Sequence, residues 1–305
     1  MPFLEQFQVL RPGPRSVSLR LAWALLCLLM VTAARAAEPL ATLTLLQGEA
    51  TVVVGSRAYV AVTGARLGAG AIIQTDDKTA LLRLEWPDGS LVDLGPATQI
   101  IIRPGAPLPR AALFYLLQGW VKHSQPTALA GQFGAAFDVA PFKGVLVSHV
   151  DGAVTTLFSE SGGEQVTGRR GGVALALRAG QAAVDEPGSA PRTQPRPPAG
   201  WLQRIPRSFR DTIPSRLSDF KAAPAALRAR AGWGYPELEP WLKAEAGVRR
   251  NFPSRFDNLL DQARFRDAVA KNLSQHPEWD GALRQHREGG TPRKSRPTTD
   301  QEPSR

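Results

Sequence analysis

The sequence predicts a mainly β protein, built as an antiparallel β sandwich, roll or β-solenoid, with a small α-helical module at its C-terminal end. Three observations predict this class. Short apolar segments alternate with glycine turns from residue 43 to 186, a proline-rich stretch follows, and helical spacing begins only at Pro236. The alternation leaves sandwich and solenoid equally open.

Residues 80–94 carry the clearest strand pattern. Every second residue from Ala80 to Trp86 is apolar, which places Arg83 and Glu85 on the other face of the strand. In the turn Pro87-Asp-Gly-Ser90, the proline ring fixes the φ of Pro87, and Gly89 can take a positive φ. The apolar alternation then resumes at Val92. The segment is therefore predicted to be a hairpin with one buried face.

The β region continues to about residue 186 in the same manner. Leu45-Leu-Gln-Gly48 recurs as Leu116-Leu-Gln-Gly119, a faint internal repeat or a chance identity of common residues. Further apolar segments follow between glycine turns, at 144–157 and 173–184. Charged side chains on exposed edge strands prevent aggregation through edge-to-edge pairing. The expected edge charges are Arg57, Lys78 and Lys122.

Four segments in the first part of this region resemble the FecR domain family. They are Gly48-Glu-Ala-Thr-Val-Val-Val54, Leu67-Gly-Ala-Gly-Ala-Ile-Ile-Gln-Thr75, Asp88-Gly-Ser90 and Leu94-Gly-Pro96. The resemblance extends weakly through Gly144-Val145 to Ala179-Gly-Gln181. It implies a periplasmic all-β module that senses or binds and that has no catalytic chemistry.

Residues 1–36 have the features of a signal peptide. Basic residues precede an apolar run from Leu21 to Val31, and Ala34-Arg-Ala36 is a small-x-small cleavage site that would leave Ala37 first. The run is too short to span a bilayer comfortably, although an uncleaved anchor is the alternative. Cleavage would also remove Cys27, the one cysteine, so the periplasmic product would have neither a disulfide nor a thiol nucleophile.

Charge divides the remaining chain into two parts. Residues 37–190 hold 11 Lys+Arg and 13 Asp+Glu and are slightly acidic. Residues 191–305 hold 22 Lys+Arg and 13 Asp+Glu, so this part of the chain is strongly basic. The expected organisation is a FecR-like all-β domain over 43–186, a proline-rich linker over 187–200, a basic, aromatic-rich helical module over 201–282 and a disordered tail over 283–305.

The basic module is expected to contain three helices. The first follows Pro236 and ends at Gly247, the second covers Phe252 to Leu260, and the third begins at an Asp261 N-cap and ends before His276. Four of the seven tryptophans lie in this module, which favours an ordered unit, packed on the β domain.

The search for catalytic chemistry finds little. His149 and Asp151 lie two apart in a predicted strand and share a face, but they have no third partner, so a polar strand face is the preferred interpretation and a hydrolase a remote alternative. Neither the histidines nor the acidic turns have metal-ligand spacing, and the glycine-rich loops lack the lysine and helix of a phosphate site. We expect no enzyme, no cofactor and no metal.

The basic residues of the C-terminal part offer the remaining prediction. Arginines next to aromatic residues are candidates for electrostatic contact with an anionic cell-wall or membrane surface, or with an acidic envelope protein: Arg249, Arg250, Arg255, Arg264 and Arg266. The simpler interpretation is that they are solvated faces of amphipathic helices. Export argues against a nucleic-acid partner.

Two functions from different classes remain. The first is a non-catalytic periplasmic binding or scaffold protein, in which the β domain binds a partner protein or a glycan and the basic module tethers it to the envelope. The second is a FecR-type regulator that passes an outer-membrane signal to a sigma-factor pathway. That role normally needs a helical cytoplasmic segment, and Arg11-Pro-Gly-Pro14 cannot continue a helix. The first is therefore the preferred hypothesis.

Overall fold

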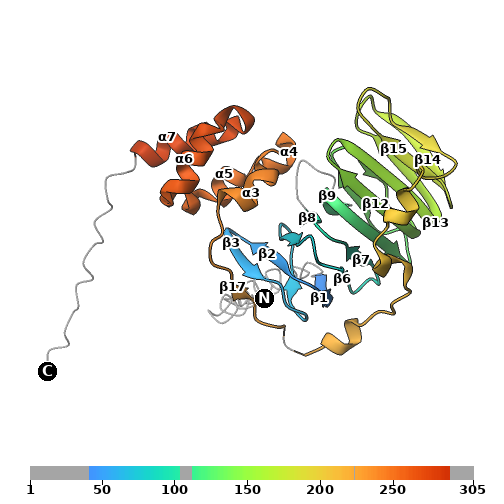
Figure 1. Cartoon of the computed structure of the whole chain (residues 1–305). Coiled ribbons are helices and arrows are strands. Elements are labelled where there is room, and N and C mark those ends of the chain that lie inside the picture. Colours follow the sequence, from blue (N-terminus) through green and yellow to red (C-terminus); the bar gives the residue numbers. More distant parts are fainter. Residues whose placement is uncertain (1–40, 104–111, 223, 289–305) are drawn as a thin grey trace, which may run out of the picture. The chain divides into compact units, whose positions relative to one another are not determined.

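The computed structural model describes residues 41–103, 112–222 and 224–288 (Figure 1). The predicted signal peptide over 1–36, its cleavage site at Ala36/Ala37 and residues 289–305 of the predicted tail lie outside the described residues. No helix among the described residues is long and apolar enough to cross a membrane.

The described strands form one continuous hydrogen-bonded sheet of 17 strands. The first eight are β1 (Ala41–Gln47), β2 (Ala50–Val54), β3 (Arg57–Val60), β4 (Arg66–Leu67), β5 (Ile72–Thr75), β6 (Leu81–Glu85), β7 (Leu91–Leu94) and β8 (Gln99–Ile102). The next eight are β9 (Ala112–Gln125), β10 (Gly131–Gly134), β11 (Phe137–Val139), β12 (Gly144–Asp151), β13 (Val154–Gly168), β14 (Val173–Arg178), β15 (Ala182–Asp185) and β16 (Arg192–Gln194). The last is β17 (Arg228–Ala229).

The sheet has two branches. Ladder A pairs, in order, β4, β1, β6, β7, β9, β12, β13, β15 and β16. Ladder B pairs β17, β3, β2, β5, β8, β9, β10, β11, β13 and β14. Among the described pairings, β9 with β10 is the one parallel pair, and the others are antiparallel.

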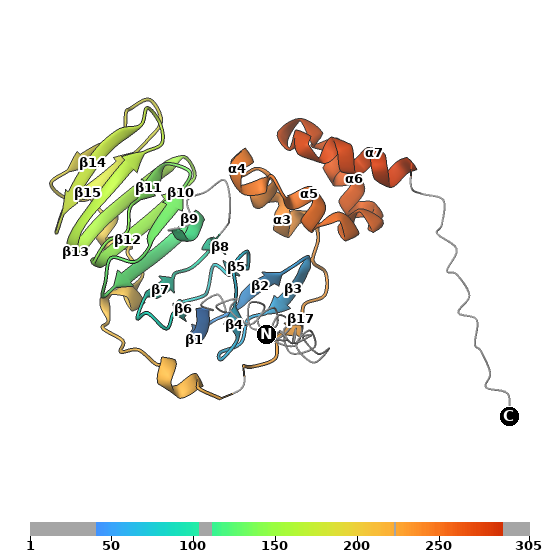
Figure 2. The same cartoon turned by 180° about the vertical axis from the view of Figure 1, so that it is seen from behind.

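The two longest strands belong to both ladders. The first half of β9 pairs in ladder B and its second half in ladder A, whereas β13 begins in ladder A and ends in ladder B. As a result β9, β10, β11, β13 and β12 close into a five-stranded barrel (Figure 2). The mainly β class with a small helical C-terminal part is confirmed, whereas the expected sandwich, roll or solenoid geometry is not.

The repeated Leu-Leu-Gln-Gly segments share one local structure. Gly48 and Gly119 both have positive φ, and a Cβ at either would lie 2.6 or 2.5 Å from the Cα of Thr79 or Thr98 respectively. Each threonine Oγ1 accepts from the N–H, and donates to the C=O, of the residue after the glycine. Glycine is required here because a side chain would collide with the threonine, so the sequence repeat reflects a repeated structural junction.

The C-terminal part of the chain covers both ladders. Residues 235–288, which we call the helical cap, contain α3 (Tyr235–Leu242), α4 (Ala246–Arg249), α5 (Phe252–Arg255), α6 (Ala263–Lys271) and α7 (Asp280–Glu288), with 3-10 turns η3 (Asp257–Asp261), η4 (Leu273–Gln275) and η5 (Pro277–Trp279) between them. Its apolar side chains share one cluster with ladder B residues, among them Val53, Ile72, Ile101 and Tyr115.

Several predicted boundaries differ in the structure. The first helix ends at Leu242, and Gly247 lies inside α4 rather than after it. The N-cap of α6 is Gln262, one residue after the predicted Asp261. Residues 192–194 of the predicted linker pair with β15, and α7 occupies 280–288, where the sequence predicted the start of a disordered tail. Residues 192–194 gain order from pairing with β15, and α7 gains it from packing on α6, η3 and η5, contacts that local composition does not reveal.

Candidate functional site: a sheet face covered by a strap

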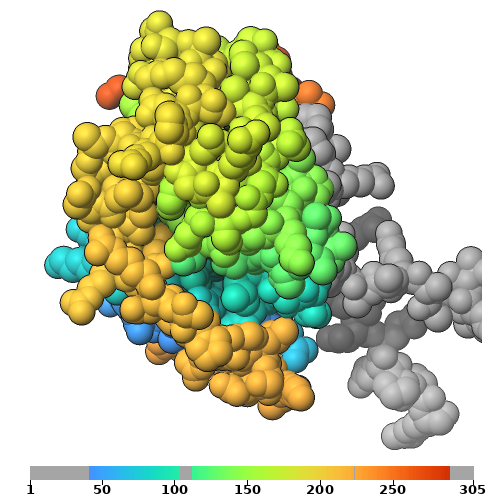
Figure 3. Space-filling model, turned by 90° about the vertical axis from the view of Figure 1, so that its right-hand side faces the viewer, coloured from blue at the N-terminus to red at the C-terminus, as the bar shows by residue number. Residues whose placement is uncertain are grey.

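Residues 201–222 and 224–230 form a strap that lies along the outer face of ladder A and ends beside ladder B, where β17 pairs with β3. The strap contains α2 (Trp201–Arg204), η1 (Arg207–Arg210) and η2 (Leu217–Phe220), joined by extended segments, and it ends in β17. Figure 3 shows these residues, in gold to orange, lying against the green and teal strands. The sequence assigned them to a helical module, but most of the strap is not helical.

Two aromatic side chains anchor the start of the strap. Trp201 and Phe209 are 1% and 2% exposed, and they pack with Leu81, Trp120 and Val147 of ladder A. The rings of Trp120 and Trp201 lie 5.1 Å apart between centroids. At Gly95 a Cβ would come within 2.9 Å of the Pro206 Cγ, so the glycine of the Leu-Gly-Pro motif leaves room for the strap.

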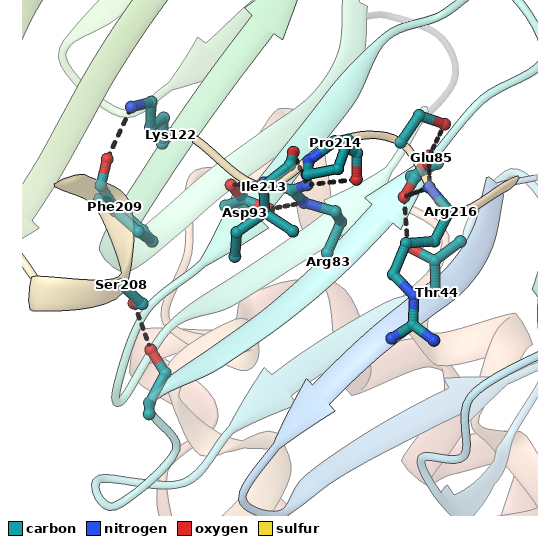
Figure 4. Close-up of polar contacts among 12 residues, drawn as sticks. Thr44, Arg83, Glu85, Asp93, Lys122, Ser208, Phe209, Ile213, Pro214 and Arg216 are labelled. Carbon is teal, nitrogen blue, oxygen red and sulfur yellow. Dashed lines mark hydrogen bonds and ion pairs between the residues drawn. The ribbon is translucent and has the colours of Figure 1, made fainter. Parts of the chain in front are cut away.

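The middle of the strap is bound by a buried ion pair. Arg83 on β6 faces Asp93 on β7 directly across the hairpin, with Nε–Oδ1 and Nη2–Oδ2 distances of 2.6 and 2.7 Å. The remaining nitrogen of Arg83, Nη1, donates to the carbonyl oxygen of Ile213 at 2.6 Å. The pair is almost fully buried, so its geometry fixes the guanidinium toward the strap backbone (Figure 4).

A buried carboxylate holds the next part of the strap. Glu85 is fully buried, and its oxygens accept from the hydroxyl of Thr44 at 2.6 Å and from the backbone N–H of Arg216 at 3.0 and 3.2 Å. The hydroxyl of Ser215 donates to the same carboxylate. A buried carboxylate needs such donors because it has lost its hydration.

Two further hydrogen bonds fix the strap near η1. Lys122 on β9 donates from Nζ to the carbonyl oxygen of Phe209 at 2.6 Å and also pairs with Glu160 at 2.9 Å. In the opposite direction, the hydroxyl of Ser208 donates to the carbonyl oxygen of Ala80 at 2.7 Å. Arg83, Glu85 and Lys122 thus all bind main-chain groups of the strap, an arrangement that recognises an extended backbone more than a particular sequence.

The sequence did not identify this face. It placed Arg83 and Glu85 on the unburied side of a half-buried hairpin, yet they are 3% and 0% exposed, because the strap covers that side. Lys122 was predicted at a sheet edge, but β9 lies between β7 and β12 in ladder A. The hairpin itself contained a usable signal, since its register sets Arg83 opposite Asp93.

The five predicted contact arginines fall into two groups. Arg249 binds the carbonyl oxygen of Ala244 and the carboxylate of Glu278, and Arg266 binds the carbonyl oxygen of Leu260. Arg255 donates to the carbonyl oxygens of Gly55 and Val53, at 2.7 and 3.4 Å, and burial lowers its pKa to about 10.

The other two arginines, Arg250 and Arg264, are exposed. Three of the five arginines thus bind the protein itself, and electrostatic contact with an anionic partner stays a prediction, carried most directly by Arg250 and Arg264.

His149 and Asp151 are not joined as a catalytic pair. The His149 ring stacks on Trp120, 3.7 Å between centroids and 14° apart, and burial lowers its pKa to about 4. Asp151 lies 3.6 Å from Arg204 of the strap. Both residues line a cavity of about 330 Å³ with Asp77. Among the described residues, no group of three His, Cys, Asp or Glu side chains is placed to hold a metal ion.

Comparisons with known proteins yield a limited structural similarity. No family model matches the chain, and no curated protein matches it. Two structures of a candidate anti-sigma factor from Parabacteroides distasonis, at 2.50 and 1.65 Å resolution, are similar with 11% and 10% sequence identity and a TM-score of 0.35 each. The similarity covers 41% of this chain and 59% of theirs, so the chain spans less than two thirds of their length.

Proposed function

We propose that the chain is a non-catalytic binding protein of the cell envelope, whose ladder A face binds an extended peptide segment, with the strap as its resident occupant. One observation carries this proposal: Arg83, Glu85 and Lys122, all on that face, each bind main-chain atoms of the strap. Backbone recognition with two aromatic anchors is a common way to bind an extended peptide, because it makes few demands on sequence.

The test is binding of the strap sequence in trans. A labelled peptide of residues 201–222 is titrated into the wild-type protein and into a Trp201→Ala, Phe209→Ala variant, whose own strap has lost its anchors. We expect binding by the variant and not by the wild type, since an occupied face excludes the peptide. Fluorescence anisotropy measures both affinities.

A third substitution locates the binding. Adding Lys122→Met to the loosened variant removes the donor to the Phe209 carbonyl and is expected to weaken peptide binding about tenfold, the effect of one charged hydrogen bond. Lys143→Met, at an exposed lysine on the β11–β12 connection, is the matched control. Equal affinities for the two variants would contradict binding at this face.

The envelope location is part of the proposal and rests on residues 1–36. N-terminal sequencing of the exported protein is expected to begin at Ala37. A product that keeps Met1 in the inner membrane would instead support a membrane-anchored protein.

The tether to an anionic surface now depends on Arg250 and Arg264, the exposed members of the five arginines. Sedimentation of the protein with insoluble cell wall at low salt should decrease in an Arg250→Glu, Arg264→Glu variant, and high salt should release the wild type. No sedimentation at low salt would remove the tether from the proposal.

A FecR-type signalling regulator is the second candidate function. The resemblance of residues 48–96 to that family favours it, and a strap held largely through backbone contacts is a segment that a signalling partner can displace. Deletion of the gene followed by measurement of sigma-factor-dependent transcription distinguishes the two functions, because a scaffold leaves that transcription unchanged.

A further inference from the structure

A second cavity, of about 320 Å³, lies where the β2–β3 turn, the β4–β5 loop and the end of α5 meet. Its volume is at the lower end of the range of small-molecule sites. Arg255 is the one charged side chain in its lining, and the rest of the lining is small or apolar: Val54, Gly55, Gly68, Ala69, Gly70 and Ala71. No residue of the strap lines it, so it is separate from the ladder A face.

The guanidinium of Arg255 is only partly used by the protein. Its Nε donates to the carbonyl oxygen of Gly55 at 2.7 Å, and its Nη2 donates to that of Val53 at 3.4 Å. The third nitrogen, Nη1, has no acceptor among the described residues, and it is not one of the buried side-chain atoms that lack a partner, so it is accessible to solvent. The Nη1–Nη2 edge of the fork is therefore free to bind a ligand.

Arg255 also lacks a counter-ion within the described chain. Its aromatic neighbour is Phe256, with the guanidinium carbon 4.8 Å from the ring centroid, and no described carboxylate pairs with it. Burial lowers the pKa of Arg255 to about 10, which leaves the side chain protonated at neutral pH. A partly desolvated cation without a counter-ion costs free energy, and an anion in the cavity would offset that cost.

The lining of the cavity narrows the class of anion. With one cation present, a monoanion is neutralised, whereas a phosphate dianion keeps an uncompensated charge in a site with no second cation. The two nitrogens of the free edge match the two oxygens of a carboxylate. Val54 is 44% exposed and offers an apolar contact, and a Cβ at Gly55 or Gly70 would meet no atom within 4 Å, so there is room for a small body.

We propose that this cavity binds a short aliphatic monocarboxylate. The carboxylate accepts from Nη1 and Nη2 of Arg255, and the aliphatic chain lies against Val54 and Ala69. Such a ligand contacts α5 of the helical cap together with the β2–β3 turn and the β4–β5 loop, so its binding reinforces the contact between the cap and ladder B.

The probe is butyrate, titrated calorimetrically into the full chain at millimolar concentration. We expect saturable binding that Arg255→Gln weakens at least tenfold, the effect of a charged hydrogen-bonded pair. Arg250→Gln, at an exposed arginine of the same cap, is the matched control and should bind as the wild type does. Absence of binding, or equal affinity of Arg255→Gln and the wild type, would overturn the proposal.

Two further ligands test the charge of the site. Butyramide has the shape of butyrate without its charge and should bind at least tenfold more weakly; equal binding would show that the carboxylate is not recognised. Inorganic phosphate at the same concentration should not displace butyrate, and displacement would replace the carboxylate site with a general anion site.

A last variant locates the ligand without altering Arg255. Ala69→Trp, at an exposed position of the lining, places a large side chain in the cavity and should abolish butyrate binding while circular dichroism and the thermal midpoint stay unchanged. Retained affinity in this folded variant would contradict the site. These outcomes are independent of the strap experiment.

Discussion

The two ladders are both covered by the C-terminal part of the chain, but the contacts that hold each cover differ. The helical cap lies on ladder B through one apolar cluster that joins Val53, Ile72 and Tyr115 to Leu238 and Trp241. The strap lies on ladder A through two aromatic anchors and a row of hydrogen bonds from Arg83, Glu85 and Lys122.

The comparison separates a permanent contact from an exchangeable one. Apolar burial has no substitute in water, so removing the cap would expose its whole interface at a large cost in free energy. The strap has fewer buried apolar anchors than the cap, Trp201 and Phe209, and its remaining contacts are hydrogen bonds between a sheet face and an extended backbone, which water or another backbone can replace at a small net cost. The ladder A face is therefore the better candidate for exchange with a partner.

The largest expected effect is on the apolar cover. Trp241 is fully buried between α3 and ladder B, so Trp241→Ala should lower the free energy of unfolding by about 4 kcal/mol. Urea denaturation followed by circular dichroism measures this change. Leu202→Ala in the strap, at a side chain that is 44% exposed, is the control and should change stability little. A loss below about 1 kcal/mol for Trp241→Ala would remove the distinction between the two covers.

The next effect concerns the polar cover. Asp93→Ala leaves the Arg83 guanidinium buried without its counter-ion and should cost about 3 kcal/mol. Limited proteolysis should then cut the strap faster, because the group that binds the Ile213 carbonyl is no longer held in position. Asp219→Ala removes an exposed partner of Arg216 and is expected to cost under about 1 kcal/mol. If both variants lose the same stability, the buried pair does not hold the strap.

A third test concerns the barrel that both covers share. Glu164 lies on β13 just after the strand enters ladder B; it is fully buried, and neither carboxyl oxygen has a hydrogen-bond partner among the described residues. Burial raises the pKa of Glu164 from its ordinary value of 4.5 to about 7. The folded state therefore holds its proton at pH values where the unfolded state has already released it.

The sign of the pH dependence follows from this difference. The contribution of Glu164 is most favourable below pH 4.5, declines as pH rises toward 7, and stays at its minimum above that. Urea titrations from acidic to mildly alkaline pH should show the wild type losing on the order of 2 kcal/mol relative to Glu164→Gln, which cannot ionise. Parallel stability curves for the two proteins would show that Glu164 does not titrate in this range.

The smallest expected effect is at Arg255, which forms one of the polar contacts between the helical cap and ladder B; another joins Gln74 to the carbonyl oxygen of Glu237. Arg255→Ala loses the hydrogen bonds to Gly55 and Val53 and should cost about 1.5 kcal/mol. Arg250→Ala, five residues earlier and exposed, should be nearly neutral. Thermal denaturation compares the two variants. Equal effects would indicate that Arg255 is as dispensable to the cap as a surface residue.

Much of the fold was accessible from the sequence because strands and turns leave local patterns. Alternation predicted the hairpin of β6 and β7, and glycines marked the turns. From the sequence, the recurrence of Leu-Leu-Gln-Gly was either a faint repeat or a chance identity. The structure gives both copies the same junction, although the threonines that complete it, Thr79 and Thr98, stand at different distances along the chain. The closure of the barrel was not accessible, since it depends on two long strands changing partners midway.

The candidate site was predictable only in part. The sequence placed Arg83 and Glu85 together on the face of a predicted hairpin opposite its apolar face. Nothing near them in the sequence indicates that a segment some 130 residues later covers that face. The arginines of the cap were noticed for their charge, and the structure divides them by contact: Arg249, Arg255 and Arg266 bind the protein, whereas Arg250 and Arg264 face solvent.

By itself the sequence determined the mainly β class, the helical C-terminal part and the charge difference between the two halves, because each of these depends on composition or on spacing between near neighbours. Only the tertiary structure decided which charged side chains are buried, which segment lies on which ladder and where cavities remain. Those outcomes depend on contacts between residues far apart in the chain, and a side chain's solvation, and with it its function, is set by whatever the fold places over it.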